Sequence, residues 1–151
     1  WKSNSQLASA RKELSQAAAF DVNHCRQHWL RFSWEHTWDA QECAGLTLDS
    51  TLMFNDRSGY RTSSALTWHP WNLSKHCEHQ ISALPTVIMD SHFYDYKPMK
   101  SLERQQSISH WINECKEVGG EIAVLWHPHT LTTDYGWFSG FDELLKAIDE
   151  V

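Results

Sequence analysis

Apolar and polar positions are arranged along the chain in two ways, one helical and one strand-like. Leucine and alanine recur at helical spacing over residues 7–18, which predicts a first helix. A second helix is predicted from Thr37 as its N-cap to Gly45 as its stop. A third covers about 101–118, where apolar residues line one face and a Gly-Gly pair follows. The fourth carries its apolar face on Phe141, Leu144, Leu145 and Ile148.

Four short apolar runs lie between these helices and predict β-strands. They are FDV at 20–22, LTLDS at 46–50, LPTVIMD at 84–90 and EIAVLW at 121–126. The last run is apolar on both faces, as expected of a parallel strand covered by helices on either side. Residues 55–80 show little periodicity, which predicts a long excursion of the kind that is usually functional or mobile.

The order of these elements predicts an α/β fold with parallel strands. In such folds, ligands bind at the carboxyl ends of the strands. Four residues with chemically useful side chains fall at or just after predicted strand ends, so they are expected to converge on one rim: Arg26, Asp49, Asp90 and His127. The length of 151 residues suits a single domain over 1–151.

The composition narrows the range of partners. The formal net charge is −6 and the 13 Lys and Arg residues are scattered, which argues against a nucleic-acid partner, since phosphate binding needs clustered positive charge. No stretch is long and apolar enough to predict a membrane span. The four cysteines form no C-x-x-C pair, which favours free thiols in a reducing compartment such as the cytoplasm. Because the chain opens on Trp1, we expect it to be the carboxy-terminal part of a longer polypeptide.

His127 and Asp49 are the strongest candidates for acid–base chemistry. His127 follows the run at 121–126, and an imidazole in that place can give or take a proton near neutral pH or bind a metal. A structural role at the strand end is the alternative. Asp49 can orient and charge-stabilise an imidazole, as buried carboxylates do in hydrolytic triads. Its alternative role is that of a turn or capping residue.

Arginine and aromatic residues gather in the segment CRQHWLRF. Arg26 and Arg31 flank His28 and Trp29 there, and Arg61 stands beside a glycine in GYR. A guanidinium suits fixed hydrogen bonding to a carboxylate or phosphate, although a surface role is the alternative. Trp29 belongs to a set of nine tryptophans, a residue type that stacks on sugars as well as packing cores.

The segment HCEH at 76–79 raises the alternative of a small metal-binding module. Histidine and cysteine are zinc ligands, so this segment is a candidate for one side of a site. These ligands lie too close together to form a tetrahedral site alone, and no matching pair stands at zinc-finger spacing. The chain also lacks the G-x-S-x-G, P-loop and H-E-x-x-H motifs, so serine hydrolase, nucleotide and zincin interpretations have no support.

Several of these pieces, taken in order, resemble the polysaccharide deacetylase superfamily, the carbohydrate esterases with a NodB-homology domain. The stretch CRQHWLRFSWEHTWDAQECAGLTLDSTLMF is similar to a strand ending in Arg, an aromatic three residues on, a helix, AG, and a strand ending in YDS. The ordered series HWLRF, DST, GYR, LPTVIMD and LWH looks most like the branch associated with bacterial surface-polysaccharide gene clusters. The resemblance covers about residues 22–150.

The resemblance implies a distorted, incomplete (β/α) barrel that removes N- or O-acetyl groups from sugars with a divalent metal. On the matching positions, His127 is the general acid, Arg26 orients a catalytic Asp, and Asp49 tunes the acid. The residues expected to contact substrate around the rim are His28, Trp29, Arg31, Arg61 and Trp126. The substrate is then an acetylated sugar of a bacterial surface polysaccharide or its precursor, and the enzyme is expected in the cytoplasm.

Two departures from the family pattern shape the expectation about the metal. The family's Asp-Asp pair and its histidine metal motif have no match here. The metal, which we expect to be zinc, is therefore expected to need residues upstream of Trp1. This chain alone is not expected to hold it. GYRTSSALTW also lacks the Gly and Pro that follow GYR in the branch. A partial barrel exposes apolar edges, so self-association or cover by an amino-terminal half is expected. The alternative is a non-catalytic carbohydrate-binding or structural descendant.

Overall fold

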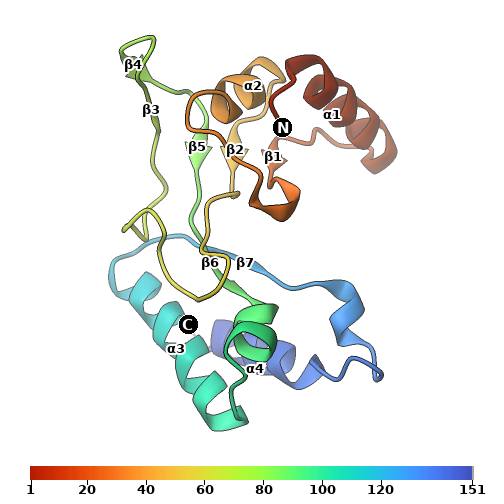
Figure 1. The fold of residues 1–151 in the computed structure, drawn as a ribbon, viewed down its shortest axis with the longest axis vertical. Helices are drawn as coiled ribbons and strands as arrows, with labels where there is room; N and C mark the ends of the chain where they lie inside the picture. Colours follow the sequence, from red (N-terminus) through yellow and green to blue (C-terminus); the bar gives the residue numbers. More distant parts are fainter. Residues whose placement is uncertain (151) are drawn as a thin grey trace. The chain divides into compact units, whose positions relative to one another are not determined.

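A computed structural model describes residues 1–150 and divides them into two compact units. Unit 1 comprises residues 1–52 and 67–84, and the described part of unit 2 comprises residues 53–66 and 85–150. The elements of both are labelled along the chain in Figure 1. No helix within residues 1–150 has both the length and the apolar character that crossing a membrane requires.

Unit 1 contains helices, short turns and five two-residue strands. Its elements are α1 (Asn4–Ala18), β1 (His24–Cys25), the 3-10 turn η1 (His28–Leu30), α2 (Thr37–Cys43), β2 (Leu48–Asp49), β3 (Trp71–Asn72), β4 (Cys77–Glu78) and β5 (Ser82–Ala83). β1, β2 and β5 form a parallel sheet in that order, with Cys25 opposite Asp49 and Asp49 opposite Ala83. β3 and β4 form a separate antiparallel hairpin.

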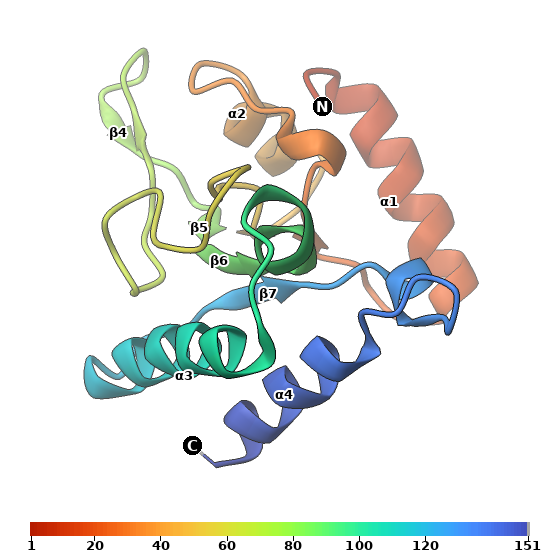
Figure 2. The same ribbon diagram turned by 60° about the horizontal axis from the view of Figure 1, so that its bottom comes forward.

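The core of unit 1 forms around the indole of Trp38, which is 2% exposed. Leu46, Leu52 and Ile81 are buried with it, and Phe32 packs edge-on against the indole at 4.8 Å between ring centres. Trp38 stands near the start of α2, so burying this ring fixes α2 to the segments around the parallel sheet. Figure 2 shows α1 and α2 on the same side of this unit.

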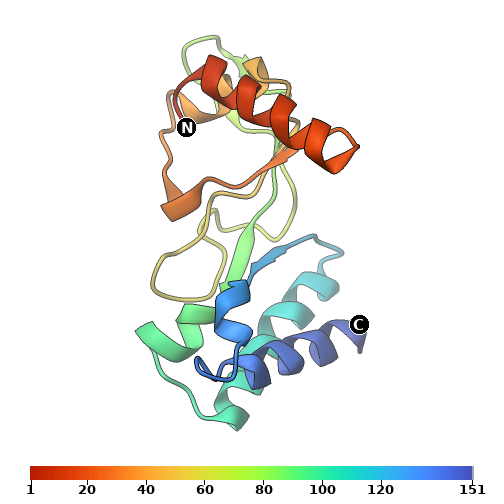
Figure 3. The same cartoon turned by 90° about the vertical axis from the view of Figure 1, so that its right-hand side faces the viewer.

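Unit 2 pairs two parallel strands with two long helices. Its elements are β6 (Thr86–Met89), the π-helical turn η2 (His92–Tyr96), α3 (Ser101–Glu117), β7 (Ala123–Leu125), the 3-10 turn η3 (Pro128–Leu131) and α4 (Phe138–Asp149). α3 and α4 pack against each other, and α3 also contacts β6 (Figure 3). Ile88 and Phe93 join Ile108 of α3 and Leu144 of α4 in one buried cluster.

The predicted α/β class with parallel strands is confirmed, and most predicted elements are present. The helices predicted near 7–18 and 101–118 are α1 and α3, and the runs at 46–50 and 84–90 contain β2 and β6. β7 pairs in parallel with β6 as expected, but Val124 is 37% exposed. The helices therefore do not cover both faces of this strand.

The structure corrects four details of the expected elements. Thr37 is the first residue of α2 rather than its N-cap, and its hydroxyl instead accepts the N–H of Ser33. The strand expected at 20–22 begins later, at β1, and the excursion over 55–80 contains the β3–β4 hairpin. On α4, Leu144 is buried whereas Leu145 is 45% exposed, since the two side chains point about 100° apart around the helix.

The loop 53–66 of unit 2 is held by a buried imidazole. His92 Nε2 donates to the carbonyl of Phe54 at 3.1 Å, and His92 Nδ1 accepts the N–H of Met89 at 3.2 Å. The side chain is 2% exposed and neutral in this arrangement, because one ring nitrogen donates and the other accepts. Burial lowers the pKa of His92, against the opposing effects of the Phe54 carbonyl and the charges of Asp56 and Asp90.

We predict that unit 2 loses stability when the pH falls below about 6.5, the ordinary pKa of histidine. In that range His92 binds a proton in the unfolded chain but stays neutral in the folded one. The free energy of unfolding therefore falls by up to about 1.4 kcal/mol per pH unit. Urea unfolding at pH 7.5 and 5, followed by hydrogen exchange in β6, measures this loss. His92→Gln should show a smaller loss over the same range, and an identical pH slope in both proteins would refute the assignment.

Candidate functional site

A buried carboxylate stands where β6 ends in unit 2. Asp90 is fully buried, and Oδ1 accepts the backbone N–H of Ser91 at 2.8 Å. Oδ2 accepts the backbone N–H of His127 at 2.9 Å, and the hydroxyl of Thr130 lies 3.1 Å away. Oδ1 is therefore held by the neighbouring residue after β6, and Oδ2 by groups at the end of β7 and in the turn that follows it. Such a carboxylate is held rigidly and stays inaccessible to solvent.

His127 completes a carboxylate–imidazole pair with Asp90. It immediately precedes Pro128, which begins the turn η3, and its Nδ1 lies 2.8 Å from Asp90 Oδ1. An ionised carboxylate only accepts hydrogen bonds, so Nδ1 carries the proton in this pair. The other ring nitrogen, Nε2, is then left to exchange a proton with a ligand. The side chain of His127 is 35% exposed, which gives a ligand access to it.

A pocket of 480 Å³ opens beside this pair and has aromatic walls. Tyr96, Tyr135 and Trp137 line it together with His127 and His129. The walls are braced from behind, since Tyr94 stacks on Trp137 at 4.6 Å with a 7° angle between the rings. Tyr135 meets Trp137 edge-on at 4.7 Å. Flat faces of this kind suit the apolar face of a sugar ring.

The geometry supports proton transfer to or from a molecule in this pocket. An imidazole held in one tautomer by a buried carboxylate is the arrangement that general acid–base catalysis uses. The carboxylate also stabilises positive charge on the ring when Nε2 is protonated. The ring centre of His129 lies 5.6 Å from that of His127. Among the residues that the structure describes, however, His129 makes no hydrogen bond to a carboxylate. The two histidines at the end of β7 therefore differ in their chemical capacity.

Asp49, the carboxylate that the resemblance assigns to the acid, lies in unit 1. Its Oδ1 accepts from Gln41 Nε2 at 2.8 Å and from the hydroxyl of Thr51 at 2.5 Å, and its Oδ2 accepts from the indole N–H of Trp38 at 3.3 Å. Burial raises the pKa of Asp49, and the hydrogen bonds from Thr51, Gln41 and Trp38 oppose that rise. These contacts join the end of β2 to α2.

The other expected rim residues of unit 1 follow β1. Arg26 is half-buried, and His28 and Arg31 are exposed. Trp29 is 78% exposed and has a left-handed backbone with φ of 61°. Its ring meets that of His28 edge-on at 5.9 Å. Such an exposed indole is available to a ligand.

The two expected rim residues of unit 2 differ in their surroundings. Trp126 packs edge-on against Tyr94 and tilted against Phe141, within the cluster that also buries Leu144. It thus lies behind the pocket of His127 and does not line it. The exposed Arg61 donates to the carbonyl of Met53 at 3.2 Å. Its guanidinium braces the loop 53–66.

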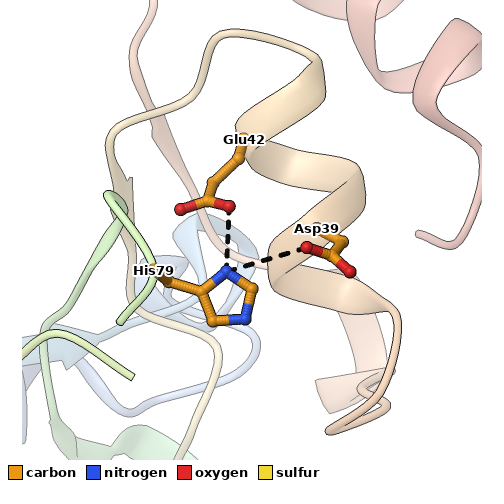
Figure 4. A group of neighbouring side chains, drawn as sticks. All are labelled: Asp39, Glu42 and His79. Carbon is orange, nitrogen blue, oxygen red and sulfur yellow. Dashed lines mark hydrogen bonds and ion pairs between the residues drawn. The ribbon is translucent and has the colours of Figure 1, made fainter. Parts of the chain in front are cut away.

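A second polar cluster lies in unit 1 and contains metal-ligand types. Asp39 and Glu42 come from α2 and His79 from the segment between β4 and β5, as Figure 4 shows. His79 Nδ1 donates to Glu42 Oε2 at 2.9 Å and lies 3.9 Å from Asp39 Oδ1. The ammonium of Lys75 lies 2.7 Å from the same Asp39 oxygen. Among residues 1–150, this is the group of three His, Cys, Asp or Glu side chains close enough to share an ion.

The surroundings of the two carboxylates favour their ionised forms. Burial alone would raise the pKa of Glu42, but hydrogen bonds from His79 and from the backbone N–H groups of Ile81 and Gln80 lower it overall. Burial likewise opposes the effect of Lys75 and Asn72, whose hydrogen bonds lower the pKa of Asp39. Both groups are thus charged at neutral pH, as metal-binding carboxylates must be.

The sequence predicts His127 as a site residue but does not predict its hydrogen-bond partner. The sequence places Asp90 at a strand end, whereas the resemblance assigns the role of tuning carboxylate to Asp49. The useful signal was parallel pairing, because the end of β6 must lie beside the end of β7, where His127 follows. The sequence did not indicate Glu42 as a site residue, because its hydrogen-bond partner His79 lies 37 positions away along the chain.

The aromatic wall of the pocket was also missed. Tyr135 and Trp137 lie on the loop between η3 and α4, where the sequence shows no periodic pattern. The features that bear on function are therefore the sequence motifs and the Asp90–His127 pair beside its pocket. No family model, no curated protein and no solved structure matches it.

Proposed function

We propose that this chain is the carboxy-terminal part of a metal-dependent carbohydrate deacetylase with an incomplete (β/α) barrel, with His127 as its general acid. The observation that carries the proposal is the 2.8 Å hydrogen bond from His127 Nδ1 to the fully buried Asp90 beside an aromatic pocket. The resemblance of the sequence motifs supplies the reaction class. The proposed substrate is an acetylated sugar of a bacterial surface polysaccharide or its precursor, handled in the cytoplasm.

In this proposal the chain's own residues bind the sugar and deliver a proton. A sugar ring lies against Tyr135 and Trp137 while water, deprotonated by the proposed upstream Asp base, adds to the acetyl carbonyl. Protonated His127 Nε2 then gives its proton to the departing amine or alkoxide, and the acetyl group is released as acetate. Asp90 holds Nδ1 and stabilises the imidazolium before the transfer. Asp90 thus takes the role that the resemblance assigned to Asp49. Arg26 keeps its proposed role of orienting an upstream Asp base.

The divalent metal of such enzymes does not fit the rim around His127. The oxygens of Asp90 already accept the backbone N–H groups of Ser91 and His127 and the ring N–H of His127, which leaves this buried carboxylate committed to the protein. His127 Nδ1 is likewise bonded to Asp90, so the pair offers a metal ion one free atom, Nε2, and a single ligand does not hold a divalent ion. The metal that polarises the acetyl carbonyl would therefore need ligands from residues upstream of this chain, and we assign it no step here.

A non-catalytic sugar-binding module is the second candidate. The observation in its favour is the aromatic wall, since Tyr135 and Tyr96 are each about half exposed beside the pocket. Exposed aromatic faces bind sugars without any chemistry. Such a module needs the wall but has no need of a proton on His127.

Acetate release from N-acetylated and O-acetylated sugar oligomers by the longer polypeptide, with zinc present, tests the proposal. His127→Gln should lower the rate by at least about 10²-fold while sugar binding persists, because a glutamine cannot carry the proton. His129→Gln is the matched control, since it lines the same pocket without a carboxylate partner, and it should keep most of the activity. Equal rates for His127→Gln and the wild type would remove the general-acid assignment, and binding without acetate release would favour the sugar-binding module.

A further inference from the structure

We propose that Asp39, Glu42 and His79 form a binding site for a divalent first-row transition metal ion, with Zn²⁺ as the representative ion. The inference is independent of the deacetylase proposal, since it rests on side chains of unit 1 alone. One imidazole and two carboxylates are a donor set that such ions accept, whereas Mg²⁺ and Ca²⁺ prefer oxygen ligands only.

The spacing of the three donor groups is close to that of ligands on one ion. With bonds of about 2.0–2.1 Å, neighbouring ligand atoms of a tetrahedral Zn²⁺ lie about 3.4 Å apart. His79 Nδ1 lies 2.9 Å from Glu42 Oε2 and 3.9 Å from Asp39 Oδ1, one value on each side of that figure. All three ligand atoms lie within 4.8 Å of one another, so displacements of up to about 1 Å in each ligand would admit the ion. Solvent would complete the coordination.

The fold holds these ligands in place from two sides. Asp39 and Glu42 stand three positions apart on α2, so they project from the same face of the helix. His79 is 4% exposed, its ring packs against Trp38 at 5.8 Å, and its Nδ1 points at both carboxylates (Figure 4). Glu42 Oε1 accepts the backbone N–H of Ile81 at 3.0 Å, which leaves Oε2 directed at His79. Outer hydrogen bonds of this kind orient metal ligands.

A cation of the protein itself already occupies part of this arrangement. The Lys75 ammonium sits 2.7 Å from Asp39 Oδ1, while its side chain is 59% exposed and free to swing into solvent. An incoming ion would displace Lys75 from Asp39 and the proton from His79 Nδ1. The imidazole would then adopt its other neutral tautomer, with the proton on Nε2. Lys75 and the metal ion therefore compete for one position.

Zn²⁺ binding by the whole chain tests the site, measured by calorimetry and by metal analysis after dialysis. The exposed thiols of Cys43 and Cys77 are replaced by serine in every protein, because free thiols bind zinc themselves. One equivalent of Zn²⁺ should remain bound. His79→Gln should weaken binding by more than about 100-fold, because the buried nitrogen ligand is lost. His76→Gln, three residues away and exposed, is the matched control and should bind as the parent does.

Two further substitutions, at the half-exposed Asp39 and the exposed Lys75, test the site even if replacing the buried His79 destabilises the fold. Asp39→Asn should weaken Zn²⁺ binding by at least about tenfold, because it removes a charged ligand. Lys75→Met should strengthen binding by about twofold to fivefold, because it removes the competing ammonium. Opposite effects of these two changes would support the site. Loss of all Zn²⁺ on dialysis of the parent, or equal binding by Asp39→Asn and His76→Gln, would overturn it.

Discussion

Replacing Asp90 by asparagine is expected to lower the rate of acetate release by about 10⁴-fold. The asparagine carbonyl can keep the place of Oδ2, where it accepts the backbone N–H of His127. Its amide then faces Nδ1 and donates to it, which moves the ring proton to Nε2. The imidazole is left in the wrong tautomer, and its protonated form loses the negative charge that stabilises it. Acetate release by the longer polypeptide measures the loss.

Asp95→Asn is the matched control for this change. Asp95 also lines the pocket but is exposed, and no described residue connects it to His127. Its removal should alter the rate by less than about tenfold. ¹⁵N spectra of His127 provide a readout on this chain by itself, because the two tautomers differ in which ring nitrogen is protonated. A folded Asp90→Asn protein that keeps the proton on Nδ1, or that retains wild-type activity, would contradict the role of Asp90.

The elements predicted well are those whose sequence pattern is enforced by burial. Ile108 and Ile112 repeat at helical spacing because α3 packs this face into the core of unit 2. The run Val87–Met89 is apolar throughout because every residue of β6 is buried. The hairpin of β3 and β4 gave no such pattern, since its strands are two residues long and mostly exposed. Short exposed strands have too few positions for alternation to be visible.

The sequence could predict only those features of the candidate site that depend on residues close together along the chain. His127 stands at the end of an apolar run, so its place at a strand end was evident. The choice between Asp49 and Asp90 depended on which strand pairs with β7, and β7 pairs with β6. Asp49 ends the parallel strand β2 and Asp90 directly follows β6, and both are buried and hydrogen-bonded within their own unit. Pattern alone therefore could not distinguish them.

The same limit applies to a buried ion pair between α3 and α4. Arg104 Nε donates to Glu143 Oε2 at 2.6 Å and Nη2 donates to Oε1 at 2.8 Å, a bidentate contact between residues 39 positions apart. Both side chains are less than a tenth exposed. Burial alone would raise the pKa of Glu143, but hydrogen bonds from Arg104, Ser101 and Gln105 lower it overall. A charged residue inside a helical apolar pattern gives no indication of its partner.

Arg104→Ala is expected to lower the free energy of unfolding of unit 2 by about 3–5 kcal/mol, because it leaves the buried Glu143 carboxylate without its cation. Urea unfolding, with hydrogen exchange in α3 to localise the effect, measures this loss. Lys146→Ala is the matched control, because Lys146 pairs with Asp142 on the exposed face of α4 and should leave the stability of unit 2 near that of the wild type.

The double change Arg104→Met with Glu143→Leu separates the cost of an orphaned charge from the value of the pair. It removes both charges from the same buried place and keeps similar volumes, so it should recover most of the stability that Arg104→Ala loses. Its stability should also depend less on pH. In the wild type, the lowered pKa of Glu143 contributes stability at neutral pH that is lost as the pH falls through that pKa. If the double variant is as unstable as Arg104→Ala, then the ion pair itself, and not the unpaired carboxylate, determines the packing of α3 on α4.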